Sequence, residues 1–489
     1  MSADFAARGL ALGARKSQNT RALIDAIRTQ GFYPQPLTRC PANDIPAVTL
    51  GAAGAASALN GRAQGNPLLL LSDARIKWLA GPATLDGSGA WLPRGAWYGA
   101  GRASQYASFE FSHTGSDLEL CVVGSFASAS ANIRVLVNDR IAALTTVPFN
   151  TGSYYYLRLT FPASTTRRIR IESAGGKLRG INVANTNEVA ATGRSYPCIA
   201  LLGDSFPEAT GASPMMDGEG AAVIRALGGN AIIGAVGGTG LLNPGTGGKV
   251  AWTDSTRLTD LTMNGVSDTL GQAVAPQLGI VMASINDQSA PSAWWNGAAN
   301  FEAAIAKAAY TVIDAWFTAN PGKPLVWFGP TWTTGNPPLD VYRIRDAVRD
   351  ACWGYAGSNV WFLDRLDAAP VLRGGARSST ATTGTTTSAS AVVTALASTA
   401  GIVSGSDAIG ASLPDGTRVL SIDSATQVTL SNAATASASG VSLTFKNDQA
   451  AHYANLQQSD GTHPDQRGHT LDALWMAQQV RRLILTEFA

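Results

Sequence analysis

From Tyr196 onward, continuous apolar runs alternate with longer stretches of helical character. The runs expected to be strands are CIALLG, NAIIGAVGG, QLGIVMASIND, PLVWFGP and NVWFLD. The stretches expected to be helices are GEGAAVIRALGG, NFEAAIAKAAYTVIDAWFTA, VYRIRDAVRDACWGYA and the amphipathic TLDALWMAQQVRRLILTEF. Strands that are apolar on both faces have to be covered on both faces, as in the parallel sheets of α/β proteins. The pattern therefore predicts an α/β domain with a parallel sheet over residues 195–489.

The stretch from residue 375 to 445 interrupts this alternation. It is rich in Thr, Ser and Ala, and apolar residues recur with a period of two in TRVLSID and QVTLS. Pro414-Asp415-Gly416, just before the first of these runs, is a turn signal. Low complexity alone would also fit a disordered segment. The period-two pattern favours a small β-rich module inserted into the α/β domain.

Residues 66–190 have the pattern of short β-strands. Apolar and polar residues alternate in FEFSHTGSDLELCVV, NIRVLVNDRIAAL and YYYLRLTFP, and turn-forming residues separate these runs. This predicts an antiparallel, jelly-roll-like β-sandwich. The aromatic residues that would suit sugar binding there are Trp91, Trp97, Tyr98 and Tyr154 to Tyr156. Filling the sandwich core is the commoner role of such residues, so a carbohydrate-binding module is one of two interpretations.

Residues 1–65 precede these domains. Loosely periodic apolar residues predict a helix over about 3–30, and a Pro-, Ala- and Gly-rich extended arm follows up to residue 65. The first residues lack the continuous apolar core of a signal peptide, and no run of 18 apolar residues occurs in the chain. We therefore expect synthesis in a cytoplasm and no membrane span.

Charge and cysteine content exclude further classes of protein. The net charge is +2 and no basic cluster is present, which argues against a nucleic-acid partner. The four cysteines lie far apart and form no CxxC pair, so neither a disulfide framework nor a zinc site is indicated. No HExxH motif and no phosphate-binding loop occurs. We expect no cofactor and no metal.

Four short polar blocks accompany the predicted elements in order. Residues 203–205 (Gly-Asp-Ser) follow the first sheet strand, residues 237–240 (Gly-Gly-Thr-Gly) the second, and residues 286–287 (Asn-Asp) the third. Residues 460–463 (Asp-Gly-Thr-His) precede the last helix. In an open parallel sheet, reacting residues gather at the carboxyl ends of the strands. The blocks therefore predict an active site at this edge.

With these blocks in this order, the chain resembles the SGNH hydrolases, also called the GDSL esterase family. The resemblance covers about residues 195–374 and 447–489. It implies a flavodoxin-like three-layer fold and ester hydrolysis. Two positions depart from the family pattern, because Ser284 stands where the third block has glycine, and Phe206-Pro207 replaces the usual Leu or Ile run.

Ser205 is the predicted nucleophile. A serine hydroxyl needs an adjacent base, and the chain has only four histidines. Asp460 lies three positions before His463 in a glycine-containing loop, which lets the aspartate orient one ring nitrogen while the other faces Ser205. These three residues form the predicted catalytic triad. Of the other histidines, His113 is interpreted as a surface residue and His469 as a structural residue. His452 either lines the site or packs against its neighbours.

The oxyanion of the reaction needs preorganised donors. The predicted donors are the Ser205 N–H, the Gly237 N–H and the Asn286 side-chain amide. A glycine suits this role because no Cβ blocks the approach of a substrate to its N–H. Gly238 takes the place of Gly237 if the register is shifted by one residue.

The substrate is suggested by the domain layout. A β-sandwich before an SGNH domain resembles certain carbohydrate acetylesterases, and LPDGTRVLSIDSATQVTLSNAATAS resembles modules of bacteriophage tail proteins. These resemblances imply a phage or prophage tail-associated esterase that removes O-acetyl groups from a bacterial surface polysaccharide. Partners would then be other virion tail components or copies of the same chain in a homotrimer.

Two alternatives stay open. One is a lipase or thioesterase of the same fold, and the other is a non-catalytic receptor-binding tail protein with an inactive hydrolase domain. The aromatic residues near the predicted site suit either sugar stacking or acyl packing, and they are Trp294, Trp295 and Trp332.

Overall fold

The computed structural model describes residues 37–63, 65–79, 83–85, 91–93, 106–123, 130–148, 153–174, 176–212, 214–267, 273–282, 285–332, 337–355, 359–366, 379–402, 404, 406–414, 417–446 and 462–487. The predicted N-terminal helix, His452 and Asp460 lie outside them. The chain forms two compact units. The first comprises Met1–Thr331, Leu339–Ala369 and His469–Ala489, and the second comprises Trp332–Pro338 and Pro370–Gly468.

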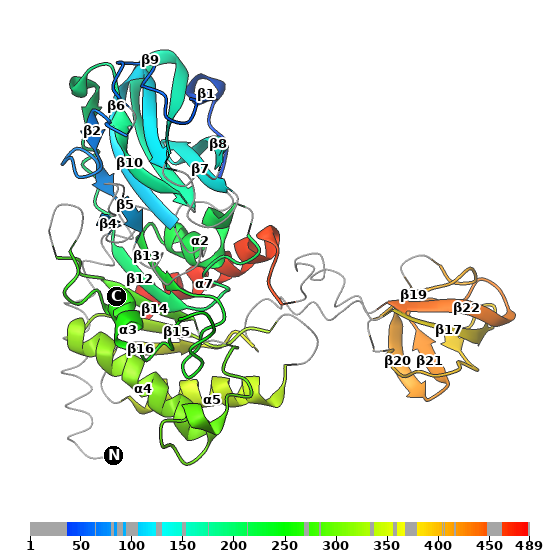
Figure 1. Cartoon of the computed structure of the whole chain (residues 1–489). Coiled ribbons are helices and arrows are strands. Elements are labelled where there is room, and N and C mark those ends of the chain that lie inside the picture. The colour runs from blue at the N-terminus through cyan, green and yellow to red at the C-terminus, as the bar shows by residue number, and fades with distance from the viewer. Residues whose placement is uncertain are drawn as a thin grey trace. The chain divides into compact units, whose positions relative to one another are not determined.

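A five-stranded parallel sheet lies at the centre of the first unit (Figure 1). Its strands are β12 (Cys198–Gly203), β13 (Asn230–Ala235), β14 (Leu278–Met282), β15 (Leu325–Phe328) and β16 (Val360–Leu363). They are arranged in the order β13-β12-β14-β15-β16. This is the 2-1-3-4-5 order of flavodoxin-like sheets. The structure thus confirms the predicted α/β class with a parallel sheet.

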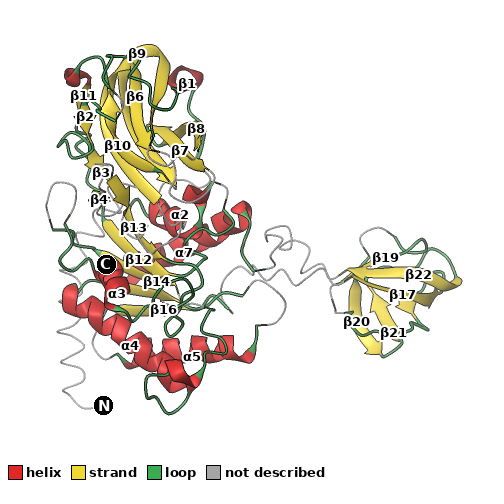
Figure 2. Ribbon diagram, in the orientation of Figure 1, coloured by secondary structure: helices red, strands yellow, loops and turns green. Residues whose placement is uncertain are grey.

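Helices cover both faces of this sheet (Figure 2). They are α2 (Glu219–Ala226), α3 (Ser255–Thr262), α4 (Phe301–Ala319), α5 (Leu339–Gly354) and α7 (Gln466–Glu487). On β12, Ile199 and Leu201 share a core with α2 and α7. The alternate residues Ala200 and Leu202 share a core with α3, α4 and α5. Because successive side chains of a strand point to opposite faces, one apolar run serves two cores and produces three layers.

We call residues 37–190 the N-terminal β region. Its strands are β1 (Ala47–Leu50), β2 (Leu69–Leu70), β3 (Lys77–Trp78), β4 (Ala83–Leu85), β5 (Trp91–Pro93), β6 (Tyr106–Val123), β7 (Ser130–Val137), β8 (Arg140–Pro148), β9 (Tyr154–Ala174), β10 (Lys177–Asn182) and β11 (Val189–Ala190). Their pairings are antiparallel, and the long strands β6 and β9 pair along most of their length. Short 3-10 helices are η1 (Ala42–Asp44) and η2 (Thr186–Glu188).

Hydrogen bonds join these strands into one 11-stranded sheet, so a division into two sheets stays a prediction. Strand β1 lies in the segment predicted as an extended arm, and it pairs with β9. Tyr155 is buried in the apolar core of this region, as expected for an aromatic residue that fills a core. Tyr156 is buried outside that core cluster, and its hydroxyl donates to the Ala63 carbonyl at 2.9 Å. His113 is also fully buried, so its interpretation as a surface residue is wrong. It lies on β6 opposite Arg167 of β9, and Glu188 covers its ring at 3.6 Å.

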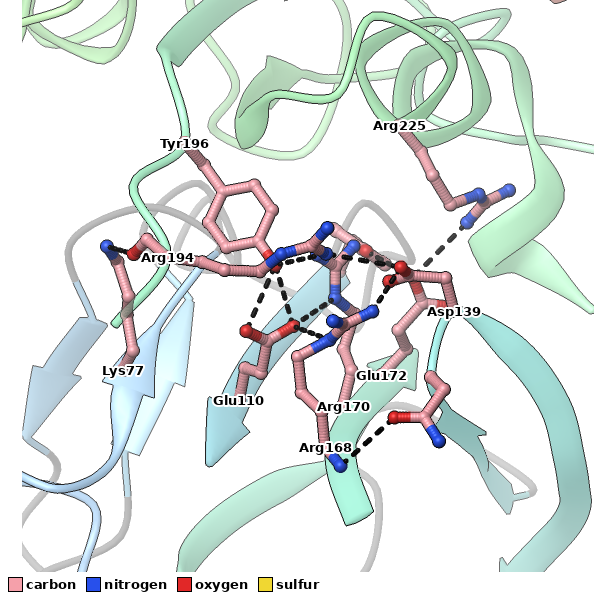
Figure 3. Close-up of polar contacts among 11 residues, drawn as sticks. Lys77, Glu110, Asp139, Arg168, Arg170, Glu172, Arg194, Tyr196 and Arg225 are labelled. Carbon is pink, nitrogen blue, oxygen red and sulfur yellow. Dashed lines mark hydrogen bonds and ion pairs between the residues drawn. The ribbon is translucent and has the colours of Figure 1, made fainter. Parts of the chain in front are cut away.

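A buried polar network joins the N-terminal β region to the α/β layers (Figure 3). The Tyr196 hydroxyl, on the segment that leads into β12, donates to Glu110 of β6 at 2.8 Å. Arg134 of β7 pairs with Glu172 of β9 at 2.5 Å, and Glu172 also lies 3.4 Å from Arg225 of α2. Buried charges are tolerated only when partners satisfy them. The two regions are therefore joined by specific ion pairs as well as by apolar contacts.

The second unit contains a small β module. Its strands are β17 (Ser379–Thr386), β18 (Val392–Val393), β19 (Asp407–Ile409), β20 (Val419–Ser424), β21 (Gln427–Leu430) and β22 (Ala438–Lys446). They form two three-stranded sheets, in the orders β17-β22-β19 and β18-β21-β20, around a core that includes Val428 and Phe445. The first and last strands pair, with Ser379 opposite Lys446. Both ends of the module therefore lie side by side, as suits a module inserted into another domain.

Candidate active site

Ser205 lies directly beyond the carboxyl end of β12, which has β13 on one side and β14 on the other. The Asp204 carboxylate accepts from the Phe206 N–H at 3.0 Å, and the Thr210 N–H donates to the Ser205 carbonyl at 3.0 Å. A Cβ at Gly203 would lie 2.3 Å from Cγ of Pro207, so this turn requires glycine there. The strand end and the turn together fix the position of Ser205, which is 8% exposed.

The glycine block follows β13 on the neighbouring strand. The Gly237 N–H donates to the Glu208 carboxylate at 2.8 Å, and Lys249 Nζ donates to the Gly237 carbonyl at 2.5 Å. Gly238 is exposed and has a φ of +77°, a conformation that favours glycine. The structure thus places Gly237 against the turn of Ser205. Its N–H is engaged by Glu208 in this state, and its role as an oxyanion donor stays a prediction.

The third block follows β14. The Asn286 amide nitrogen donates to the Thr239 carbonyl at 3.0 Å and lies 3.4 Å from Oδ2 of Asp204. Asn286 therefore bridges the residue that precedes Ser205 and the glycine block. The structure brings together three of the four predicted blocks, through Asp204, Glu208 and Asn286.

Asp287 holds the glycine block in place. Its buried carboxylate accepts from the backbone N–H groups of Leu241, Leu242 and Asn243 at 2.8–2.9 Å. Burial raises the pKa of this carboxyl to about 6, although the three amide donors act in the opposite direction. The loop after β13 is thereby anchored to the residue next to Asn286.

The fourth block is only partly described. His463 is half-buried just before α7 and belongs to the second unit, whereas Ser205 belongs to the first. Asp460 lies outside the described residues. The contact of Ser205 with His463, and the orienting role of Asp460, stay predictions.

A buried charged cluster, which the sequence pattern did not predict, lies beside the turn of Ser205. His469 Nε2 lies 3.0 Å from the Thr210 carbonyl, and its Nδ1 lies 3.7 Å from Glu219 of α2. Arg365 pairs with both Glu219 and Asp472. Burial raises the pKa of Asp472 to about 7 and raises that of Glu219 as well. The signal available in the sequence was the His469–Asp472 pair, spaced about one helical turn apart in the amphipathic last helix.

The described part of the site supplies a hydroxyl, a side-chain amide and backbone N–H groups at the end of a buried strand. These groups suit attack on a carbonyl carbon and stabilisation of an oxyanion. Among the residues that the structure describes, no cluster of three His, Cys, Asp or Glu side chains could hold a metal. No helix in the described ranges is long and apolar enough to cross a membrane.

No protein-family model and no curated protein matches the chain. Its structure is similar to that of a family two carbohydrate esterase from Cellvibrio japonicus, with 15% identity, 65% of this chain and 89% of that chain covered, and a TM-score of 0.42. It is also similar to an acetyl xylan esterase from the rumen bacterium Butyrivibrio proteoclasticus, with 14% identity, 65% of this chain and 89% of that chain covered, and a TM-score of 0.42. A third similar structure is that of a salicylyl-acyltransferase from a tetracycline biosynthetic pathway, with 12% identity, 60% of this chain and 84% of that chain covered, and a TM-score of 0.43.

Proposed function

We propose that this protein is a serine esterase that hydrolyses O-acyl groups, most simply O-acetyl groups, on a carbohydrate. The observation that carries the proposal is the position of Ser205. It follows β12, an inner strand of the parallel sheet, in a turn built by Asp204, and Asn286 reaches Asp204 from the end of the neighbouring strand β14. This is the edge at which open α/β sheets place their reacting groups.

In the proposed reaction, the Ser205 hydroxyl oxygen attacks the ester carbonyl carbon while His463 accepts the hydroxyl proton. The carbonyl oxygen becomes an oxyanion, which the Ser205 N–H, the Asn286 amide and a glycine N–H stabilise. The sugar alkoxide leaves and takes the proton from His463, which leaves an acyl-serine. Water then loses a proton to His463 as its oxygen attacks the acyl carbon. The bond to the Ser205 oxygen breaks, His463 returns the proton to that oxygen, and the carboxylic acid is released. Asp460 holds the imidazole in the required tautomer.

Active-site labelling tests this proposal. A fluorophosphonate probe should modify the folded protein, and Ser205→Ala should abolish both the labelling and the hydrolysis of p-nitrophenyl acetate. Loss of the nucleophile in a serine hydrolase reduces kcat by about 10⁶. Ser116→Ala, a substitution of a half-buried serine in the N-terminal β region, is the matched control and should leave both readouts unchanged. A folded parent protein that neither labels nor hydrolyses esters would refute the esterase function.

The substrate and the location of the protein are finer parts of the proposal. We propose a bacterial surface polysaccharide as substrate and a phage or prophage tail as location, with tail proteins or further copies of the chain as partners. The resemblance of the residue 375–445 segment to tail-protein modules supports this. Acetate release from a panel of acetylated bacterial polysaccharides, with chain-length preference on p-nitrophenyl esters, separates it from a lipase or thioesterase. A sharp preference for acetate is expected.

One observation favours a second candidate, a non-catalytic binding protein. The Glu208 carboxylate holds the Gly237 N–H, one of the predicted oxyanion donors. Loss of one oxyanion donor costs about 10²–10³ in kcat, so a hydrolase domain with that donor permanently engaged would bind a glycan and cleave it only slowly. The labelling experiment distinguishes the two, because a binding protein would retain glycan affinity without reacting with the fluorophosphonate.

A further inference from the structure

A pocket of about 220 Å³ lies between the loop after β13, the loop after β14 and helix α4. Its lining includes two adjacent indole side chains, Trp294 and Trp295, together with Thr253, Asn296 and Lys307. Trp294 is 36% exposed, although it is a large apolar side chain. We call this feature the tryptophan pocket.

The loop that carries both indoles has a defined local structure. It forms the 3-10 helix η4 (Ser292–Trp294) and then reverses through Asn296 and Gly297, which both have positive φ. The indole N–H of Trp295 donates to the Ala290 carbonyl at 3.1 Å. Lys307 Nζ, from α4, donates to the Asn296 carbonyl at 3.0 Å. The indole of Trp295 is therefore anchored, and the turn beside it is fixed to α4.

The pocket is connected to the candidate active site through Asp287. Asp287 is next to Asn286 in the chain. Its carboxylate accepts from the backbone N–H groups of Leu241 and Leu242, and these two leucines also line the pocket. The Ala290 N–H donates to the Asp287 carbonyl at 3.0 Å. One carboxylate thus positions both the glycine block and a wall of the pocket. The pocket is therefore built on the same two loops, after β13 and after β14, that carry Gly237 and Asn286.

The chemistry of the lining identifies the occupant. Indole faces stack on the C–H faces of sugar rings, and hydroxyl, amide and ammonium groups bind sugar hydroxyls. The lining is mixed, since aliphatic residues also contribute to it, namely Leu241, Leu242, Ala304 and Ala308. Indoles together with hydroxyl, amide and ammonium groups favour a sugar ring over an acyl chain, which would leave those polar groups without partners. The volume is below the ~300–1,000 Å³ of pockets for drug-sized ligands, so it suits a single ring. We propose that the tryptophan pocket is a glycan subsite that holds one pyranose ring adjacent to the acylated sugar. This inference rests on the proposed esterase function.

The inference can be tested without catalysis. Protein labelled with 5-fluorotryptophan and carrying Ser205→Ala is titrated with a panel of methyl glycosides and, separately, with hexanoate as an acyl-chain mimic. The Trp294 resonance is assigned with Trp294→Phe. We expect methyl glycosides to shift this resonance and hexanoate to leave it unchanged. The resonance of Trp353, a 70% exposed indole on α5, is the control and should not move.

Kinetics provide the second test. On the most active polysaccharide of the acetylated panel, Trp294→Ala should raise KM by about tenfold, in line with the loss of one aromatic contact, and leave hydrolysis of p-nitrophenyl acetate unchanged. Trp353→Ala should change neither. A Trp294 resonance that responds to no glycoside, or only to hexanoate, would overturn the inference. If the folded protein has no esterase activity but its Trp294 resonance still responds to glycosides, the proposed function is refuted and the glycan subsite is still supported.

Discussion

The Glu208 carboxylate occupies a decisive position in the candidate site, because it lies on the turn of Ser205 and binds the Gly237 N–H. With Lys249 on the Gly237 carbonyl, it fixes both sides of that residue and so orients Gly238. We expect Glu208→Ala to lower kcat for p-nitrophenyl acetate about ten- to hundredfold, because small misplacements of catalytic groups are costly. Urea unfolding should show a loss of ~1–3 kcal/mol, since a buried N–H loses its acceptor.

The matched control is Glu208→Gln, which keeps an oxygen acceptor of similar reach. It should recover most of the stability and activity that Glu208→Ala loses. A Glu208→Ala variant faster than the parent would contradict this view. It would mean that Gly237 is the oxyanion donor and that Glu208 blocks it.

Two carboxylates, Glu219 and Asp472, share a single guanidinium, that of Arg365, in a fully buried cluster. Burial raises the pKa of Asp472 to about 7, above its ordinary value of 3.8. Between these two values the folded protein holds a proton that the unfolded chain has lost. The contribution of Asp472 to the free energy of unfolding should therefore fall as the pH rises from about 4 to about 7, and stay constant above that.

Asp472→Asn isolates this effect, because asparagine resembles the protonated carboxyl at every pH. The stability of this variant relative to the parent should improve steadily across that window in urea unfolding. Gln479→Ala, at a half-buried position in the same helix, changes no titratable group and is the control, which should show no such trend. A parallel pH dependence of Asp472→Asn and the parent would refute the shift.

At the scale of single elements, helix α4 depends on its N-cap. The Asn300 side chain accepts from the Ala303 N–H at 2.8 Å, which satisfies one of the first backbone donors of the helix. Asn300→Ala should lower the free energy of unfolding by ~0.5–2 kcal/mol, whereas Asn300→Asp should cost much less. Thermal or urea unfolding of both variants measures the difference. Equal losses would mean that the cap contributes little.

Elements were predictable from sequence where their pattern reports burial directly. The run CIALLG became β12, and the alternation in the N-terminal β region gave antiparallel strands. Helix α3 was missed because it has only eight residues, three of them threonine, and its start depends on the Asp254 cap. Strand β1 was missed because a four-residue strand exists only through its partner β9.

The candidate site was predictable in its blocks and not in their connections. Ser205, Gly237 and Asn286 follow three strand ends, as the strand pattern indicated. Glu208 could not be assigned to Gly237 from sequence, because their contact spans 29 positions and depends on which strand lies beside β12. The same holds for Arg365 and Asp472, which are 107 positions apart. Such pairs are determined by tertiary packing alone.

At the scale of the first unit, the N-terminal β region and the α/β layers share a core and an ionic network. Tyr106 of β6 packs in the same apolar cluster as Ile199 of β12. Glu172 is fully buried, which opposes its ionisation, but Arg134, Arg225 and Arg170 together lower its pKa to about 2. Its ordinary pKa is 4.5, so its ion pairs contribute fully above that pH, and the contribution is lost as the pH falls toward 2.

Removal of one cation from this network tests whether the two regions fold as one. Arg134→Met leaves Glu172 buried with one fewer partner, and breaking a buried pair in this way typically costs ~3–5 kcal/mol. Arg158→Met breaks a partly exposed pair with Asp117 on the same sheet and should cost ~0–1 kcal/mol. Hydrogen exchange in Arg134→Met should show β9 and β12 losing protection together, because neither core is complete without the junction. Loss of protection in β9 alone, with β12 unchanged, would show that the α/β layers are stable without the N-terminal β region.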